Sequence, residues 1–581
     1  VIGTESVSFS TGSEKNQTYA SAAAVNSKGI VPNNKYDRYN FNVRNTTSFL
    51  DDKMTLDVNA SYILQKDRNM VNQGTYNNPL VGAYLFPRGN DWEDIKMYER
   101  YDVARKIYTQ YWPTGDGNMT MQNPYWVNYR NLRENKKDRY MLGASLNYQI
   151  LDWLNVSGRV RLDNSNNDYT EKAYASTNTQ LTELSDRGLY GISRSYEKQL
   201  YADFLVSVNK TFGEKWSLQA NMGGSFTDMR YDEMAVRGPI ADDSKSFAGE
   251  KAGLTNGFYI QNLSTTKTSK MQSGWREQTQ SIYASAEVGY QSTYYLTLTG
   301  RNDWNSRLVN TSEESFFYPS VGLSGIISEM VKLPEFISYL KVRGSYTEVG
   351  SPVSQSGLTP GTVTTPIIGG ALAPTGIYPF TDFKAERTRS YELGLSVRLW
   401  NKLSAEVTYY KSNTYNQTFI GDLPEFSGYK QIYLQAGNVQ NHGWEASLGY
   451  RDSFGDFSFS SNLTFSRNVN EIKEMVENYR TDMSPEPINV PEVRKDNGRV
   501  ILKVGGSIND IYANTFLKKD SQGYVEIKQD GSYGLEQGEP VFLGKTSPDF
   551  NLGWSNSLSY KGFGLSFLIN GRFGGVVTSS T

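Results

Sequence analysis

The sequence predicts an all-β protein: a transmembrane antiparallel up-and-down β-barrel with long extracellular loops and short periplasmic turns. Three observations lead to this fold class. Apolar side chains recur at every second position in many segments, the joints between these segments alternate between short and long, and the polar face of the segments carries many charges. The chain of 581 residues has no run of about 18 apolar residues, so we expect no transmembrane helix.

The clearest alternation lies in residues 389–412, which read RSYELGLSVRLWNKLSAEVTYYKS. Apolar side chains from Tyr391 to Leu399 alternate with polar ones, and the pattern resumes at Leu403 after a turn at 400–402. Successive side chains leave a strand on opposite faces, so a period of two indicates strands with one apolar face. These segments exceed the usual five or six residues of a strand. A membrane crossing by tilted strands of about 9–11 residues accounts for their length.

The same alternation recurs along the chain and predicts about eighteen strands. Further examples are residues 54–64, 139–150, 154–163, 216–226, 340–346, 444–450, 457–465 and 563–569. The short joints are 12–16, 51–53, 151–153, 213–215, 291–293, 400–402, 452–456 and 561–562, and a ninth at 328–339 is expected to hold one helical turn at LPEFISYL. The longer joints are 28–36, 65–137, 164–196, 229–277, 302–316, 350–386, 412–441 and 467–548. A meander with this rhythm has its short turns at one end and its long loops at the other.

The polar face decides between a membrane barrel and a soluble sheet. Its charged side chains include Arg159, Arg161, Asp163, Lys341, Arg343, Glu392, Arg398 and Glu406. A dry core does not accept so many charges, and lipid penalises a Lys or Arg at the bilayer midplane by about 2–4 kcal/mol. We therefore expect the apolar face to contact lipid and the polar face to line a wet interior. Tyr and Trp near the strand ends fit an interfacial girdle, and ordinary strand propensity is the alternative explanation.

Composition excludes several functional classes. The 59 basic and 61 acidic residues give a formal net charge of -2, so the composition lacks the excess of basic residues that is typical of nucleic-acid-binding proteins. There is no Cys, which excludes disulfides, thiolate metal sites and Cys nucleophiles. The single His, His442, cannot build a multi-His metal site and leaves little room for His-based catalysis. We therefore expect a protein that is not an enzyme and that has no metal site and no cofactor.

Longer stretches carry a family resemblance. Residues 339–352, 386–419, 436–451, 301–308, 316–329 and 544–575 resemble successive blocks of the SusC/RagA family of TonB-dependent outer-membrane transporters of Bacteroidetes. Two of these blocks are YLKVRGSYTEVGSP at 339–352 and AGNVQNHGWEASLGYR at 436–451. Residues 7–44 resemble the stretch that follows the family's plug domain. The block RNDWNSRL at 301–308 departs from the family's usual sequence after its Arg.

The resemblance implies a barrel of about 22 strands, an N-terminal plug inside it and a TonB-box segment that contacts TonB. It also implies a location in outer-membrane lipid and a SusD-like lipoprotein lid, and it allows a dimer of SusC–SusD pairs. The implied function is TonB-dependent import of oligosaccharides or, in some members, oligopeptides. The plug, the TonB box and the last strands have no counterpart in residues 1–581, so we expect the chain to be the barrel portion of a transporter.

Aromatic faces beside amide and carboxylate groups suit sugar binding, and the long loops contain both. The first candidate substrate-binding set lies in the loop 65–137 and comprises Tyr84, Phe86, Trp92, Tyr111, Trp112, Asp116, Tyr125 and Trp126. The second comprises Asn302, Asp303, Trp304, Asn305 and Arg307. The alternative interpretation is that these side chains pack the loops on each other or against the lid.

Other functional classes stay open at this point. A TonB-dependent siderophore receptor, a receptor for another nutrient and a passive porin would share the barrel. A surface adhesin or an outer-membrane enzyme is a different class. The enzyme would need a catalytic Ser/His/Asp set at one rim, which a chain with one His hardly provides.

Overall fold

The structure is a computed structural model. It describes residues 1–71, 74, 76–112, 122–352, 367–368, 371–372, 375–378, 383–422, 429–435, 437–481, 484–490, 492–495 and 499–577. The chain forms two compact units. Unit 1 comprises residues 1–205 and 225–278, and unit 2 comprises residues 206–224 and 279–577.

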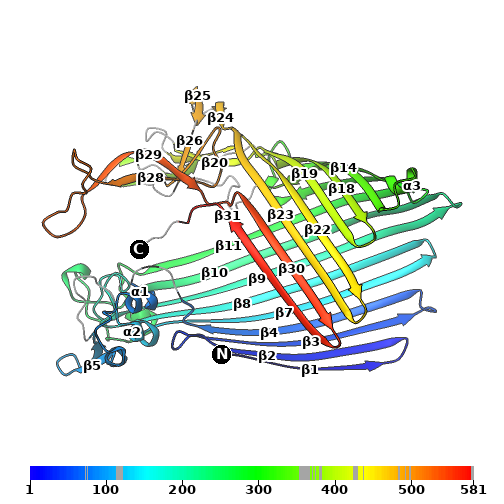
Figure 1. Ribbon diagram of the computed structural model, residues 1–581. Coiled ribbons are helices and arrows are strands. Elements are labelled where there is room, and N and C mark those ends of the chain that lie inside the picture. The colour runs from blue at the N-terminus through cyan, green and yellow to red at the C-terminus, as the bar shows by residue number, and fades with distance from the viewer. Residues whose placement is uncertain are drawn as a thin grey trace. The chain divides into compact units, whose positions relative to one another are not determined.

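Eighteen strands belong to one hydrogen-bonded sheet, and each pair with a defined register runs antiparallel, as in an up-and-down meander (Figure 1). This arrangement confirms the predicted all-β, antiparallel fold class. None of the helices in the described ranges is long and apolar enough to cross a membrane.

In unit 1 the strands β1, β2, β3, β4, β7 and β8 pair in that order. Their bounds are β1 Ile2–Gly12, β2 Asn16–Lys28, β3 Lys35–Phe49, β4 Met54–Arg68, β7 Asn131–Leu151 and β8 Leu154–Tyr174. Between β4 and β7 lie α1 Pro79–Tyr84, η1 Trp92–Lys96, β5 Glu99–Asp102, β6 Ile107–Gln110 and α2 Pro124–Arg130. The strands that contribute to both units are β9 Gly188–Phe212, β10 Trp216–Pro239 and β11 Ser269–Tyr290, with η2 Lys245–Phe247 and η3 Ile260–Asn262 between the last two.

In unit 2 the strands β12, β13, β14, β18, β19, β22, β23, β30 and β31 pair in that order. Their bounds are β12 Tyr294–Asn305, β13 Ser315–Ile326, β14 Ile337–Ser351, β18 Glu386–Leu399, β19 Leu403–Tyr415, β22 Asn438–Phe454, β23 Phe457–Glu474, β30 Phe550–Tyr560 and β31 Phe563–Phe573. The connections hold η4 Ser306–Leu308, α3 Ile327–Met330, β15 Ile367–Ile368, β16 Ala371–Leu372, β17 Thr375–Tyr378, β20 Thr418–Asp422, β21 Tyr429–Gln435, β24 Val476–Thr481, β25 Ser484–Val490, β26 Glu492–Lys495, β27 Val500–Lys503, β28 Asp510–Leu517 and β29 Leu535–Lys545.

Several strands are longer than a bilayer crossing requires. β8 has 21 residues and ends at Tyr174, and β9 has 25 residues and begins at Gly188. The predicted loop boundaries at 164 and 196 are therefore wrong. Beyond the apolar band these strands contact loops as well as water, and Ala173 and Leu189 are buried there, so the alternation of apolar and polar side chains fades while backbone pairing continues. Polar contacts such as the Arg237–Glu171 ion pair, with 2.8 Å between Nε and Oε2, hold this outer part.

The prediction of a helical turn at LPEFISYL is also wrong. The short helix α3 lies earlier, at Ile327–Met330, and residues 335–336 form a turn that leads into β14. Pro334 disfavours helical geometry in the residue before it, and its carbonyl accepts a hydrogen bond from the Ile337 amide at 2.8 Å. The chain can then enter the strand directly.

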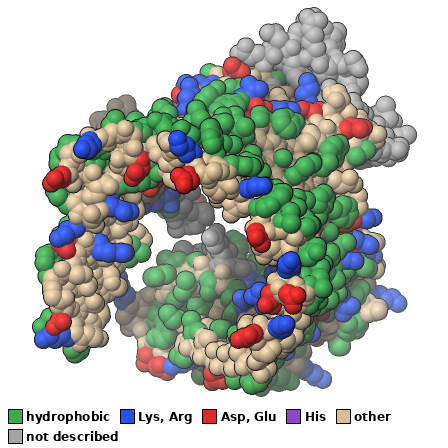
Figure 2. Space-filling model, turned by 90° about the vertical axis from the view of Figure 1, so that its right-hand side faces the viewer, with side chains coloured by type: hydrophobic (Ala, Val, Ile, Leu, Met, Phe, Trp, Pro, Cys, Tyr) green, Lys and Arg blue, Asp and Glu red, His purple; other side chains and the backbone are tan. Residues whose placement is uncertain are grey.

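The apolar face of the strands is exposed. Leu393 and Leu395 of β18 are 64% and 42% exposed, and Val43, Leu142 and other apolar side chains of unit 1 are similarly open. Figure 2 shows hydrophobic side chains spread over the molecular surface. Contiguous exposed apolar surface of this extent marks an interaction with a membrane or a partner. The alternative of a dry core built from these residues is therefore wrong.

The loops of unit 1 pack in part through polar side chains, and Glu250 is the clearest case. Oε1 of Glu250 accepts hydrogen bonds from the Thr266 amide and from the hydroxyls of Ser264, Thr265 and Thr266, at 2.9 to 3.0 Å. Burial raises the pKa of Glu250, but these hydrogen bonds outweigh burial and lower the pKa from 4.5 to about 2. The contact therefore favours the ordered loop above about pH 4.5 and loses this contribution as the pH falls through about 2.

We predict that replacing Leu395 by Arg destabilises the complete protein in lipid vesicles by about 2–4 kcal/mol, because the guanidinium would face the acyl chains. Ser396→Arg is the matched control, since this neighbour lies on the polar face, and should change the free energy of unfolding by about 0.5 kcal/mol or less. Guanidinium titrations would measure both values. Equal losses for the two variants would contradict the assignment of the faces.

We predict that Glu250→Gln increases hydrogen–deuterium exchange at the Thr266 amide at pH 7, because the neutral amide is a weaker acceptor than the carboxylate. In the unaltered protein the same protection should persist at pH 5 and disappear only as the pH approaches 2. Glu14→Gln, in an exposed turn, serves as the control. Protection that is lost already near pH 5 would refute the role of Glu250.

Candidate functional site

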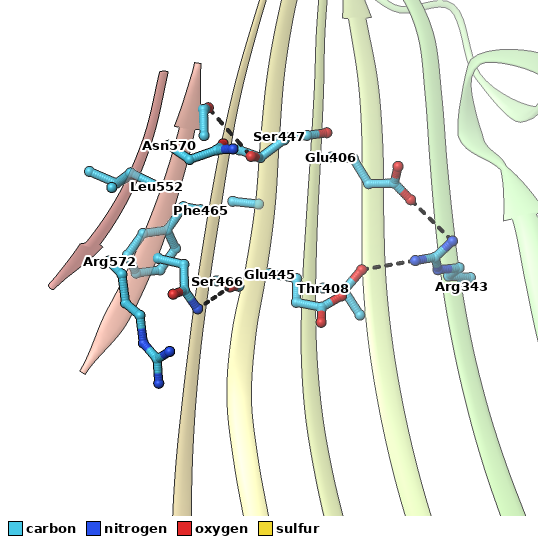
Figure 3. Close-up of a pocket in the computed structure, with 15 residues that line it drawn as sticks. Arg343, Glu406, Thr408, Glu445, Ser447, Phe465, Ser466, Leu552, Asn570 and Arg572 are labelled. Carbon is cyan, nitrogen blue, oxygen red and sulfur yellow. Dashed lines mark hydrogen bonds and ion pairs between the residues drawn. The ribbon is translucent and has the colours of Figure 1, made fainter. Parts of the chain in front are cut away.

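A concave polar surface lies on the charged face of unit 2, with a volume of about 640 Å³. Figure 3 shows its side chains, which come from six strands, β14, β19, β22, β23, β30 and β31. It is lined by Arg343, Glu406, Thr408, Glu445, Ala446, Ser447, Thr464, Phe465, Ser466, Asn551, Leu552, Gly553, Asn570, Gly571 and Arg572. We call this surface the polar wall.

The register of the strands arranges the polar wall in two adjacent rows, which continue on β14 and β18 into Lys341, Gly394 and Ser396. In the first row the Cα partners are Arg343, Gly394, Thr408, Glu445, Ser466, Asn551 and Arg572. In the second they are Lys341, Ser396, Glu406, Ser447, Thr464, Gly553 and Asn570. Neighbouring strands lie about 4.8 Å apart, so each row offers a polar group at nearly every such step across the sheet.

Arg343 reaches across a whole strand to anchor this surface. Its Nη1 lies 3.1 Å from Oε1 of Glu406, and its Nη2 donates a hydrogen bond of 2.8 Å to Oγ1 of Thr408, both on β19 (Figure 3). The side chain passes over Gly394 of β18, where an added Cβ would lie 2.4 Å from Nε. Glycine at position 394 therefore opens the path that joins β14 to β19.

The other two charged residues of the polar wall, Arg572 and Glu445, differ in their contacts. Arg572 donates a hydrogen bond of 3.1 Å from Nη2 to the carbonyl of Thr546. The carboxylate of Glu445 forms no ion pair within the described residues. Nδ2 of Asn551 donates to Oγ of Ser466 at 3.3 Å. The arrangement can bind a polar ligand through hydroxyl, amide and carboxylate groups, and within the described residues no three His, Cys, Asp or Glu side chains gather as a metal site would require.

The first predicted set of loop residues lies in unit 1, and the structure brings part of it together. The ring centroids of Phe86 and Trp92 are 5.3 Å apart, those of Phe86 and Trp112 are 6.2 Å apart, and those of Trp92 and Tyr125 are 6.4 Å apart. Edge-to-face contacts of this kind stabilise a folded loop. The aromatic cluster made by these four residues therefore supports packing of the loop, and Trp92 stays 37% exposed.

The other members of this set lie in different surroundings. Trp126 of α2 is fully buried, and its Nε1 donates a hydrogen bond of 3.0 Å to Oγ1 of Thr177. The guanidinium of Arg100 lies 3.3 Å from the ring centroid of Tyr111, whereas Tyr84 at the end of α1 is 86% exposed. Asp116 lies outside the described residues.

The second predicted set is split between the two faces of β12. Asp303 and Asn305 are buried and share one face, while Trp304 is 41% exposed on the other. Asp303 accepts hydrogen bonds from Nε of Arg301 at 2.8 Å and from the hydroxyl of Tyr318 at 2.6 Å.

The remaining members of the second set are Arg307 and Asn302. Asn305 caps η4 by accepting a hydrogen bond of 2.9 Å from the amide of Arg307, which is itself half-buried. Asn302 is half-buried on the face of Trp304.

Sequence reasoning placed Arg343 and Glu406 on the polar face but did not recognise the polar wall. Its other charged members, Glu445 and Arg572, were not singled out. The period of two gives the face of each residue and carries no information on which residues share a row. Only the strand register supplies that information.

Comparison with known proteins gives the family. The sequence matches the family described as TonB dependent receptor-like, beta-barrel, over residues 83–512. TonB-dependent receptor P3 of Formosa agariphila is 24% identical over 626 residues, which cover 100% of this chain and 58% of the relative. TonB-dependent receptor P26 of the same organism is 24% identical, with 98% of this chain and 57% of the relative covered. The chain thus spans less than two thirds of the length of these relatives.

Solved structures show the same fold. The RagAB peptide transporter aligns with a TM-score of 0.74 at 17% identity, over 98% of this chain and 61% of that chain. The outer membrane transporter YddB from Escherichia coli aligns with a TM-score of 0.53 at 11% identity, over 96% and 61%. The predicted resemblance, the transmembrane β-barrel fold class and the location in the outer membrane are confirmed. The chain belongs to the TonB-dependent receptor-like β-barrel family.

Proposed function

We propose that the complete protein imports oligosaccharides or oligopeptides across the outer membrane in a TonB-dependent cycle. We further propose that residues 1–581 are its barrel portion, and that a plug and a TonB-contacting segment belong to the same protein. The proposal rests on the family and above all on the polar wall. Its two rows repeat hydrogen-bonding groups at steps of about 4.8 Å, which suits a linear ligand with repeating polar groups better than a compact chelate such as a siderophore.

The proposed cycle makes and breaks no bond. Substrate binds between the extracellular loops, a SusD-like lipoprotein lid and the plug. TonB then pulls on the plug, and the ligand passes along the polar face. We propose that exposed loop side chains such as Tyr84 and Trp92 contact substrate first, because they face solvent, whereas the buried Trp126 holds the loop together. Pairing of two transporter–lid complexes into a dimer is compatible with this cycle.

Substrate class is the finer part of the proposal. The RagAB complex is a peptide transporter by its name, but its likeness to this chain concerns the fold. The polar wall carries both signs of charge, through Glu445 and Arg572, beside neutral hydroxyl and amide groups. Such a surface can serve the termini of a peptide or the hydroxyls of a sugar, so both classes enter the test.

The test measures uptake of fluorescent glycan and peptide pools by cells that express the complete protein, with and without TonB. We expect uptake of one pool that disappears in cells without TonB. Uptake that continues without TonB would identify a passive porin and refute the proposal. Uptake of an iron chelate alone would identify a siderophore receptor instead.

We predict that Glu445→Ala weakens uptake, because this carboxylate has no ion-pair partner among the described residues and is free to bind ligand. Loss of one hydrogen bond to a charged group corresponds to a rise of about tenfold or more in the half-saturating substrate concentration. Glu392→Ala is the matched control, since Glu392 lies on the same face in the adjoining row of β18. An equal effect of both variants would argue against a specific role of the polar wall.

We predict opposite consequences for two aromatic residues of the first loop. Trp126→Ala should lower the free energy of unfolding by about 3–5 kcal/mol, because it empties a fully buried site. Tyr84→Ala should leave stability within about 0.5 kcal/mol and weaken substrate binding. Thermal unfolding and equilibrium binding of the transported pool would separate the two effects. Unchanged binding in Tyr84→Ala would remove this residue from the proposed site.

A further inference from the structure

On the apolar face of unit 1, the side chains change from apolar to charged over four successive rows. One row across β2, β3, β4 and β7 contains Ala22, Phe41, Tyr62 and Tyr140, and its last three members are 40% to 51% exposed. The next row contains Ala24, Tyr39, Leu64 and Asp138. The two rows beyond it are mainly charged. Aromatic residues of this kind sit at the membrane–water interface, so the charged rows lie at the level of the lipid headgroups.

These charged rows collect cations that face one another. The row nearer the membrane contains Asn26, Asp37, Lys66 and Lys136, and the outer row contains Lys28, Lys35, Arg68 and Glu134. Lys28 is the direct cross-strand partner of Lys35, and Lys35 is that of Arg68. Like charges directly opposite each other on neighbouring strands are destabilising. An anion between them would remove this cost.

The neighbouring acids neutralise only part of this charge. Glu134 pairs with Arg68 at 2.5 Å, and Asp138 pairs with Lys136 at 3.1 Å. Asp37 is the cross-strand partner of Lys66, but no ion pair joins them. Within the described ranges, the exposed ammonium groups of Lys28, Lys35 and Lys66 have no ion-pair partner. Asp138, which pairs with Lys136, also interacts electrostatically with Lys66, and Glu5 aligns with Ala24 on the same face. Three cations without an ion-pair partner are left beside these carboxylates, and we call them the lysine cluster.

We propose that the lysine cluster binds the phosphate group of a lipid headgroup in the outer leaflet. The cluster is on the side of the long loops, away from the short turns, which places it at the outer surface of the membrane. Lys side chains can lay their stems along apolar surface and hold the ammonium at the headgroup level. A phosphate offers several acceptor oxygens for charged donors, so one headgroup can contact more than one of the three.

Position favours a lipid over a soluble anion. Lys66 lies two rows, and Lys28 and Lys35 three rows, from the exposed aromatic residues, on the face that the acyl chains cover. A headgroup whose chains occupy the apolar band therefore meets the cluster without leaving the bilayer, whereas a soluble anion gains no apolar contact. The lysine cluster belongs to unit 1 and the polar wall to unit 2, and they share no residue, so lipid binding stands or falls independently of substrate import.

The test uses the complete protein purified in neutral detergent micelles. Binding of a lipid A probe with two phosphates is compared with that of the same lipid after removal of both phosphates, by native mass spectrometry. The test variant combines Lys28→Gln, Lys35→Gln and Lys66→Gln. The matched control combines Lys15→Gln, Lys53→Gln and Lys215→Gln, three exposed lysines of the short turns. Circular dichroism and thermal unfolding verify that both variants are folded.

The expected result is tight binding of the phosphorylated probe by the unaltered protein and by the control. The test variant should bind it at least about tenfold more weakly, since each Lys near an anionic surface contributes to membrane attraction. A triple Lys→Arg variant should restore binding. Equal binding of the dephosphorylated lipid, or an unchanged affinity in the Gln variant, would overturn the proposal. Displacement of the probe by millimolar inorganic phosphate would indicate a site for free anions and would overturn it as well.

Discussion

The need to satisfy every backbone amide and carbonyl in lipid governs this structure. In the hydrocarbon core an unpaired group costs several kcal/mol, so the chain crosses as long antiparallel strands that hydrogen-bond to their neighbours. Once the strands are paired, alternation assigns each side chain to one face. The register then brings side chains from distant parts of the chain into rows. The polar wall and the lysine cluster are each built from two such rows, the first on a polar face and the second on an apolar face.

The fold class could be predicted from the sequence because its main signal is local. Alternation within residues 391–409 is visible without knowledge of any partner strand, and the structure has strands there. The ends of the strands were harder to predict. Beyond the membrane β8 and β9 contact folded loops as well as solvent, so the side-chain pattern does not mark where pairing stops.

The polar wall could not be predicted from the sequence, for a related reason. The tight turn at 400–402 fixes Ser396 opposite Glu406. By contrast, a long connection separates β14 from β18, so the alignment of Arg343 with Gly394 is not encoded locally. The loop aromatics present the same difficulty. In the sequence Trp92 and Trp126 are equally good candidates for substrate binding. Only the tertiary structure shows that Trp126, which contacts Thr177, is a core residue and that Trp92 is exposed.

The passage of Arg343 over Gly394 has a consequence for how the sheet assembles. A slip of β14 by two residues along β18 would set Arg343 opposite Glu392 or Ser396, whose side chains obstruct the route to β19. Opposite Ser396 the guanidinium would align with Glu406 but lie one row away from Thr408, and opposite Glu392 it would align with neither, so the pair of contacts seen here would be lost. Gly394 in the middle strand therefore favours one alignment of the three strands during insertion into the membrane, because only that alignment lets Arg343 reach both of its partners on β19.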